Sequence, residues 1–295
     1  MLFLKTMHHK KFFYLCLSLG MLMFFLLGCT KNPPEDTVGL DQEYLQPKLI
    51  LTTADLKIDC EEPNYINLDT ITEESLLITQ PGCHILSGEM KGSVCINAEE
   101  QIVHLVFNGV TVDAIHGPAL KIESAGKVIV TLMEETENSF LDSGTYPKGE
   151  EADACIYSQC DLTINGNGHM NVYGYHKDAI HTKDILKVLG GSIFVQAKRD
   201  GLRGNDGIVI NCESIDIQSE ENGICSTKTG KETKGNIEIY GSNCSIIGGK
   251  YAISCAADLY IAESDIYAIG IVDDFRVDGV SSIAEGSLQD DWISS

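Results

Sequence analysis

The chain has 295 residues, of which 43 are Asp or Glu and 21 are Lys or Arg, so its formal net charge is −22. Such an excess of acid leaves no basic surface to neutralise phosphates, which argues against nucleic-acid binding. With 43% hydrophobic residues the chain can bury a core, which excludes global disorder.

The N-terminus has the pattern of a secretion signal. Residues 1–11 carry lysines and no acid, and an apolar run follows from Phe12 to Gly28. This run is short for a membrane span and long enough for a signal core. The boundary before Cys29 resembles a bacterial lipobox, which implies a lipidated Cys29; an ordinary secretory signal or an uncleaved anchor are the alternatives. We expect an extracytoplasmic protein, held to the bacterial cell membrane through that lipid.

Cysteine usage leaves the pairing open. Nine cysteines remain beyond Cys29, an odd number, and no Cys-x-x-Cys motif occurs among them. A zinc ribbon or thioredoxin-like site is therefore disfavoured. Buried free thiols in place of small apolar side chains are the favoured interpretation.

Short strands are predicted from about residue 75 onward. Apolar and polar residues alternate as in half-buried strands over the segments 77–79, 83–86, 94–96, 104–107 and 128–132.

A repeat of 22 residues then runs along the chain. The unit that begins at Asp178 recurs at Asp200 and again at Asn222, and the same interval separates Asp184 from Asp206. One more unit precedes this series by 24 residues, and another follows it after seven inserted residues in a Lys-rich stretch. Several features that share one period indicate a repeat architecture.

Repeats of this length predict a solenoid. Each unit contains two short β-branched segments, and strands this short cannot form hairpins at a fixed pitch, but they can coil and pair in parallel with their equivalents one coil away. The predicted fold is all-β, a single-stranded right-handed parallel β-helix with about 22 residues per rung. A β-propeller or a leucine-rich solenoid fits this pattern less well. Residues 1–28 would be the lipoprotein signal peptide, residues 29–50 the lipidated cysteine and a tether, and residues 51–295 the β-helix domain, with the clearest repeats over 154–270.

Several motifs resemble those of one family, in order along the chain: PGCHILSG at 81–88, HLVFNGVTV at 104–112, EETENSFLD at 134–142, CDLTINGNG at 160–168 and the units at Asp178 and Asp200. The chain resembles the bacterial carbohydrate-binding β-helix proteins, which are often lipoproteins and are similar in fold to pectate-type polysaccharide lyases. The resemblance covers about residues 75 to 270. It implies a calcium-binding right-handed β-helix that recognises plant polysaccharides, polygalacturonate and cellulose among them.

Stacked acids point to a cation site. In a β-helix Asp178 and Asp200 lie about 4.8 Å apart, and Asp184 and Asp206 form a second such column. Two carboxylates at that spacing repel by roughly 1 kcal/mol even in water, so either one is protonated or a cation lies between them. Ca²⁺ suits such a site, with Asn222 offering a neutral oxygen. The alternative is that each Asp accepts hydrogen bonds from turn amides.

Aromatic side chains would bind a neutral glycan. Tyr173, Tyr175 and Lys177 are the predicted carbohydrate-binding residues. Galacturonate carboxylates, which an acidic protein repels, could instead complete the shell of a bound Ca²⁺.

Three functions remain open. The favoured one is a monomeric cell-surface lipoprotein that binds polysaccharide with calcium and without turnover. A calcium-dependent polysaccharide lyase would need a basic residue to abstract a proton, and Arg203 is the candidate. The third is a surface adhesin or scaffold that binds a protein.

Overall fold

The computed structural model describes residues 48–230 and 233–289, all within one compact unit that spans 44–295. These residues form twenty-five strands and one short 3-10 turn, η1 (Leu68–Thr70), without an α-helix. None of their helical segments is long and apolar enough to cross a membrane. The predicted signal peptide, residues 1–28, and Cys29 lie outside the described residues.

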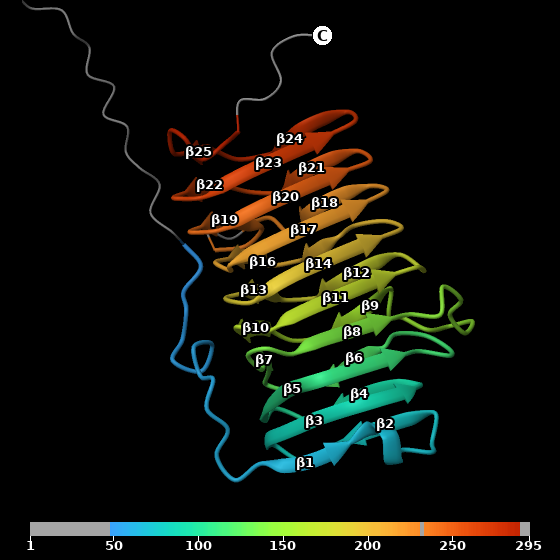
Figure 1. Ribbon diagram of the computed structural model, residues 1–295. Helices are drawn as coiled ribbons and strands as arrows, with labels where there is room; N and C mark the ends of the chain where they lie inside the picture. Colours follow the sequence, from blue (N-terminus) through green and yellow to red (C-terminus); the bar gives the residue numbers. More distant parts are fainter. Residues whose placement is uncertain (1–47, 231–232, 290–295) are drawn as a thin grey trace, which may run out of the picture. The chain divides into compact units, whose positions relative to one another are not determined.

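The strands form three parallel faces that wind around one core (Figure 1). The first face contains β7 (Lys127–Leu132), β10 (Leu162–Gly166), β13 (Ile185–Val188), β16 (Gly207–Ile210), β19 (Asn236–Tyr240), β22 (Leu259–Ala262) and β25 (Ser281–Ile283). The second face contains β8 (Glu137–Leu141), β11 (His169–Gly174), β14 (Ser192–Ala197), β17 (Ser214–Ser219), β20 (Asn243–Gly248) and β23 (Asp265–Gly270). The third face contains β2 (Ser75–Ile78), β4 (Ser93–Asn97), β6 (Leu120–Ser124), β9 (Ala154–Ser158), β12 (Asp178–Thr182), β15 (Leu202–Gly204), β18 (Asn222–Ser226), β21 (Tyr251–Cys255) and β24 (Asp273–Val277).

Long strands join the first two faces near the start of the β-helix. β5 (Ile102–Asp113) pairs with β7 through its first half and with β8 through its second. β3 (Gly82–Lys91) pairs with β5 along its length, with a register shift after Leu86, and the short β1 (Asn64–Asn67) pairs with β3. The predicted all-β parallel β-helix is thus confirmed.

The register between coils confirms the predicted period. Ile180 pairs with Leu202 and Leu202 with Ile224, a step of 22 residues each time. Ile224 then pairs with Ile253, 29 residues further on. The seven extra residues fall between β18 and β19, inside the Lys-rich stretch where the sequence placed them.

Each coil contains three strands rather than the two that the alternation indicated. The units that begin at Asp178 and Asn222 are strands of the third face, β12 and β18, and every residue in both is buried. A strand buried on both sides has no alternation of apolar and polar residues. The sequence pattern therefore revealed the repeat of these units but not that they are strands.

Inward side chains stack in columns from coil to coil. On the second face Ile193, Ile215, Cys244 and Ile266 pair in succession, and all are buried. Each fully buried aliphatic side chain contributes about 1.5–3 kcal/mol, and β-branched residues suit the pleated surface. The repeat therefore builds one continuous core along the coils.

Most of the free cysteines among the described residues are buried. Six of the free cysteines are buried, as predicted: Cys155, Cys160, Cys212, Cys225, Cys244 and Cys255. Cys95 is free and half-buried. The pairing that the sequence left open is a single disulfide among the described residues, between Cys60 and Cys83.

A strap, residues 48–58, runs along the outside of the first face (Figure 1). The backbone amides of Lys48 and Leu49 donate to Glu238 Oε1 at 2.5 and 2.8 Å. At its other end Asp55 pairs with Lys127 and Lys187 at 2.6 and 2.7 Å. The predicted tether, 29–50, therefore already contacts the β-helix through its last residues.

Candidate functional site

A polar groove of about 420 Å³ crosses the outer surface of the second face. It runs over β8, β11, β14, β17 and β20, so it follows the axis of the coils for about 19 Å, four strand spacings. It is lined by Glu137, His169, Asn171, Ser192, Ile193, Phe194, Ser214, Ile215, Asp216, Asn243 and Ser245. The outward positions of these strands alternate with the buried aliphatic columns, and most of them carry hydroxyl, amide or carboxylate groups.

An aromatic patch, Tyr173, Tyr175 and Phe194, lies beside this groove. The rings of Tyr173 and Tyr175 are 6.0 Å apart and 20° from parallel, and Phe194 lies 5.9 Å from Tyr173. Tyr175 is 47% exposed. The structure thus brings together the two predicted tyrosines. Sequence analysis missed Phe194, although its outward place in the alternation of Ser192–Ala197 was readable.

Asp142 holds the turn that carries Tyr175. Its Oδ1 accepts hydrogen bonds from the backbone amides of Gly144 and Tyr175 at 3.0 and 2.9 Å. The amide of His176 and the hydroxyl of Tyr146 donate to the same carboxylate, and the Tyr146 ring stacks on His176 at 4.1 Å. Burial raises the pKa of Asp142, and these hydrogen bonds oppose the shift. The loop after β8 and the Tyr175 turn are therefore one connected unit.

Asp216 offers an unsatisfied acceptor inside the groove. It lies between Phe194 and Ser245 of the neighbouring coils. Its Oδ1 is buried and has no hydrogen-bond partner within the described part of the chain. A buried acceptor without a partner is rare in proteins. Hydroxyl groups of a ligand in the groove would satisfy it.

The predicted column of Asp178 and Asp200 exists, but an arginine neutralises it. The fully buried Asp178 accepts two hydrogen bonds from Arg199 at 2.5 Å and one from the Asp200 backbone amide at 3.1 Å. Asn222 in turn donates to Asp200 Oδ1 through its side chain at 2.7 Å and its backbone amide at 3.2 Å. Burial raises the pKa of Asp178, and Arg199 opposes that shift.

In the second predicted column, Asp184 and Asp206, two lysines form ion pairs with Asp206. Lys228 lies 2.7 Å from Asp206 Oδ1, and Lys234 pairs with Asp206 Oδ2. The pKa of Asp206 is lowered because these two lysines outweigh the effect of burial, whereas burial and the neighbouring acids raise that of Asp184. Both lysines come from the seven-residue insertion region, so this loop carries the counter-charge of the column.

Side chains of the protein already engage several of the oxygens that were predicted to bind Ca²⁺. Calcium needs six to eight oxygen ligands. Both oxygens of Asp178 bind Arg199, Asp200 is engaged by Asn222, and Asp206 is paired with lysines. Asn222 Oδ1, in contrast, is buried and has no hydrogen-bond partner within the described residues, and calcium binding at these columns stays a prediction.

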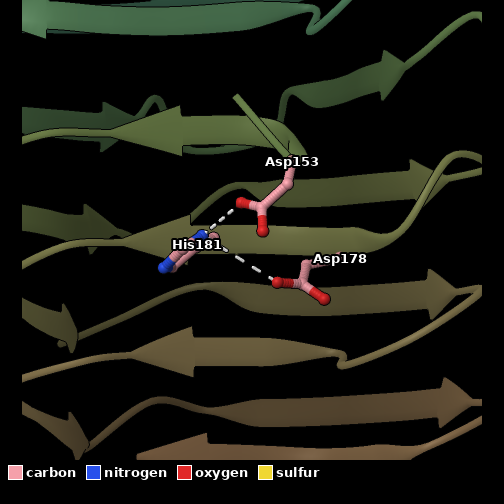
Figure 2. Close-up of side chains that lie close together, drawn as sticks. All are labelled: Asp153, Asp178 and His181. Carbon is pink, nitrogen blue, oxygen red and sulfur yellow. Dashed lines mark hydrogen bonds and ion pairs between the residues drawn. The ribbon is translucent and has the colours of Figure 1, made fainter. Parts of the chain in front are cut away.

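A further group, Asp153, Asp178 and His181, brings three potential metal ligands within 4.8 Å (Figure 2). His181 Nδ1 lies 2.5 Å from Asp153 Oδ1, and its Nε2 faces Asn205 Oδ1 at 3.3 Å, an oxygen that also accepts from two other side chains. Each ring nitrogen of His181 therefore faces an oxygen of a neighbouring side chain. Because Arg199 also pairs with both carboxylates, the group is a closed ion-pair network.

Arg203, the candidate base, contacts this network. Arg203 Nε donates to Asn205 at 3.2 Å, and its Nη1 lies 3.7 Å from Asp178 Oδ2. Lys177 is half-buried in the turn before β12. Its backbone carbonyl accepts from the Arg199 amide.

Fold and site together define a parallel β-helix with a polar groove flanked by aromatic rings on one outer face. Residues 72–274 match the family model described as "Carbohydrate-binding domain-containing protein", and the chain belongs to this family. A relative of that description from Acetivibrio thermocellus is 32% identical over 255 residues, which is 83% of this chain and 89% of the relative. A solved structure, a polysaccharide lyase-like protein from C. thermocellum studied as a gadolinium derivative, is similar with a TM-score of 0.70 at 29% identity, covering 77% of this chain and 98% of that one.

Proposed function

We propose that the protein binds plant-type polysaccharide along the groove of the second face, without turnover. The observation that carries the proposal is the groove itself, a polar channel with aromatic rings on one side and an unpaired Asp216 oxygen within it. Membership of a carbohydrate-binding family agrees with a polysaccharide ligand.

Each part of the groove has a separate task. The rings of Tyr173 and Tyr175 give flat apolar surfaces on which the C–H faces of a sugar can stack, while phenol hydroxyls stay in water. Asn171 and Asp216 offer hydrogen-bond partners to sugar hydroxyls. A groove about 19 Å long, four strand spacings, fits a short stretch of an extended glycan better than a single sugar.

The charge of the groove favours a neutral glycan such as cellulose. Glu137 and Asp216 both line it, and they repel uronate carboxylates. Polygalacturonate would need a cation between ligand and protein, and calcium-assisted binding remains the prediction for that ligand. We further propose that the protein acts outside the cytoplasm, anchored at Cys29 through lipid, and as a monomer.

The test is binding of the purified protein to cellulose, cello-oligosaccharides and polygalacturonate, the last with Ca²⁺ and with a chelator. The double variant Tyr173→Ala/Tyr175→Ala should weaken binding about tenfold, because an aromatic contact contributes about 0.5–1.5 kcal/mol beyond its buried area. Tyr65→Ala is the matched control, because Tyr65 is 74% exposed on β1, away from the groove.

Other outcomes would replace the proposal. Ultraviolet absorbance of unsaturated product, rising with time, would assign a polysaccharide lyase. Equal loss of binding in the Tyr65 control would remove the groove as the site. If the protein bound none of these glycans, the remaining hypothesis would be a surface scaffold that binds another protein.

A further inference from the structure

The groove on the second face carries acids without basic partners. Glu137 and Asp216 line it, and no Lys or Arg occurs among its lining residues. The strands β8, β11, β14, β17, β20 and β23 of this face contain no Lys or Arg either. On the first face, by contrast, Lys187 pairs with Asp55 of the strap. The second face therefore offers its acids to a cation from outside the protein.

Asp216 is the acid that most needs such a partner. It lines the groove and is half-buried. Its Oδ1 is buried without a hydrogen bond, and no Lys, Arg or His of the described chain forms an ion pair with it. Burial weakens the hydration of a carboxylate, so leaving it unpaired costs free energy. A positively charged ligand group in the groove would remove that cost.

An aromatic ring lies directly beside this carboxylate. Phe194 on β14 and Asp216 on β17 are paired in register, so their outward side chains are neighbours at about one strand spacing, 4.8 Å. The Tyr173 ring lies 5.9 Å from that of Phe194 and extends the aromatic surface. The face of an aromatic ring attracts a cation. A metal ion needs several oxygen ligands, whereas an organic ammonium group is held by one carboxylate and a neighbouring ring.

We propose that the groove prefers glycans whose sugars carry protonated amino groups, with Asp216 as the acceptor of an ammonium group. This inference rests on the proposed function, because the same groove holds the glycan. An ammonium group forms charge-assisted hydrogen bonds, which are roughly twice as strong as those between neutral groups. Glu137 on β8 lies three strands from Asp216 on β17, about 14 Å. Amines repeated along one chain can therefore meet both acids.

The test compares two oligosaccharides of equal length and the same β-linked glucose backbone. One is a cello-oligosaccharide, and the other is a fully deacetylated glucosamine oligosaccharide, in which an amine replaces one hydroxyl of each sugar. Calorimetric titration of the purified protein in mildly acidic buffer, where such amines are protonated, should give at least about tenfold tighter binding of the amino sugar. Added NaCl should reduce the difference, because salt screens charge pairs.

Asp216→Asn removes the charge and keeps the shape of the side chain. It should lower the affinity for the amino sugar to about that for the cello-oligosaccharide, and change the latter less than about twofold. Asp273→Asn is the matched control, because Asp273 is exposed on β24 of the third face and leaves the groove intact. His169 pairs in register with Glu137 inside the groove. His169→Gln should keep or increase the preference, because a protonated imidazole repels an ammonium group.

The outcomes separate this inference from the proposed function. Equal affinity of the wild type for both oligosaccharides overturns the inference and leaves glycan binding intact. A preference that Asp216→Asn and Asp273→Asn reduce equally also overturns it, since net charge would then select the amine. Failure to bind either oligosaccharide, or any other glycan, contradicts the proposed function itself. Thermal unfolding checks that each variant folds; if Asp216→Asn does not, Glu137→Gln replaces it, with a partial loss of the preference expected.

Discussion

At the scale of single residues, Arg199 is the counter-charge of two acids. It pairs with Asp178, which is fully buried, and with Asp153 at 2.7 Å. Arg199→Met should lower the free energy of unfolding by about 3–5 kcal/mol, because it leaves buried carboxylates without a partner. Urea unfolding measures this change. A loss below about 1 kcal/mol, the range of exposed ion pairs, would contradict the buried network.

Two further measurements sharpen this prediction. Arg276→Met removes an exposed pair with Asp278 and should cost at most about 1 kcal/mol. Added Ca²⁺ should stabilise Arg199→Met more than the wild type, because carboxylates freed from the guanidinium can bind the ion. Equal stabilisation of both proteins would place any calcium site elsewhere.

The sequence predicted the stacking of the acids but not what neutralises them. The interval between Asp178 and Asp200 places the two on adjacent coils, and the register confirms it. Whether a cation, a proton or a side chain balances the charge depends on how Arg199 folds back over the turn. Asp153, its second partner, lies in the irregular loop after β8, where no period applies.

At the scale of elements, the strap depends on one buried acid. Asp55 is fully buried and meets Lys127, Lys187 and the Thr163 hydroxyl at 2.6–2.7 Å. Asp55→Ala should lower the free energy of unfolding by about 3–5 kcal/mol, since it leaves lysines uncompensated beneath the strap. Denaturant unfolding measures the loss, and limited proteolysis within residues 48–58 should become faster.

The pH dependence of the strap has a defined sign. Ion pairs and hydrogen bonds hold the pKa of Asp55 well below its usual range, despite burial. Its contribution is therefore complete above the unfolded pKa of about 3.9 and is lost as pH falls below that value. The stability difference between wild type and Asp55→Asn should shrink as the medium is acidified from about pH 4 to about pH 2, because the Asp55 carboxylate then loses its stabilising contribution. A difference that grows in acid would show that another group anchors the strap.

Elements were predictable where they repeat and not where they occur once. The steps of 22 residues fixed the coils because equivalent side chains stack, as Ile180, Leu202 and Ile224 do. The strap has no counterpart in the repeat, and its contacts join Lys48 to Asp258 and Asp55 to Lys187, distant in sequence. The sequence predicted only part of the candidate site. Tyr173 and Tyr175 follow the repeat, but the turn that positions Tyr175 depends on Asp142.

At the scale of the whole molecule, a net charge of −22 sets which glycans can approach. Without calcium, polygalacturonate meets a repulsive field whose range falls from about 30 Å at 0.01 M salt to about 8 Å at 0.15 M. Binding of polygalacturonate in chelator should therefore strengthen as NaCl is added, whereas binding of a neutral cello-oligosaccharide should change little. Paired titrations of the purified protein at the two salt concentrations measure both. If polygalacturonate binding weakened with salt instead, attraction to a local cation such as Lys177 would outweigh the field of the molecule, and the preference of the groove for neutral glycans would be wrong.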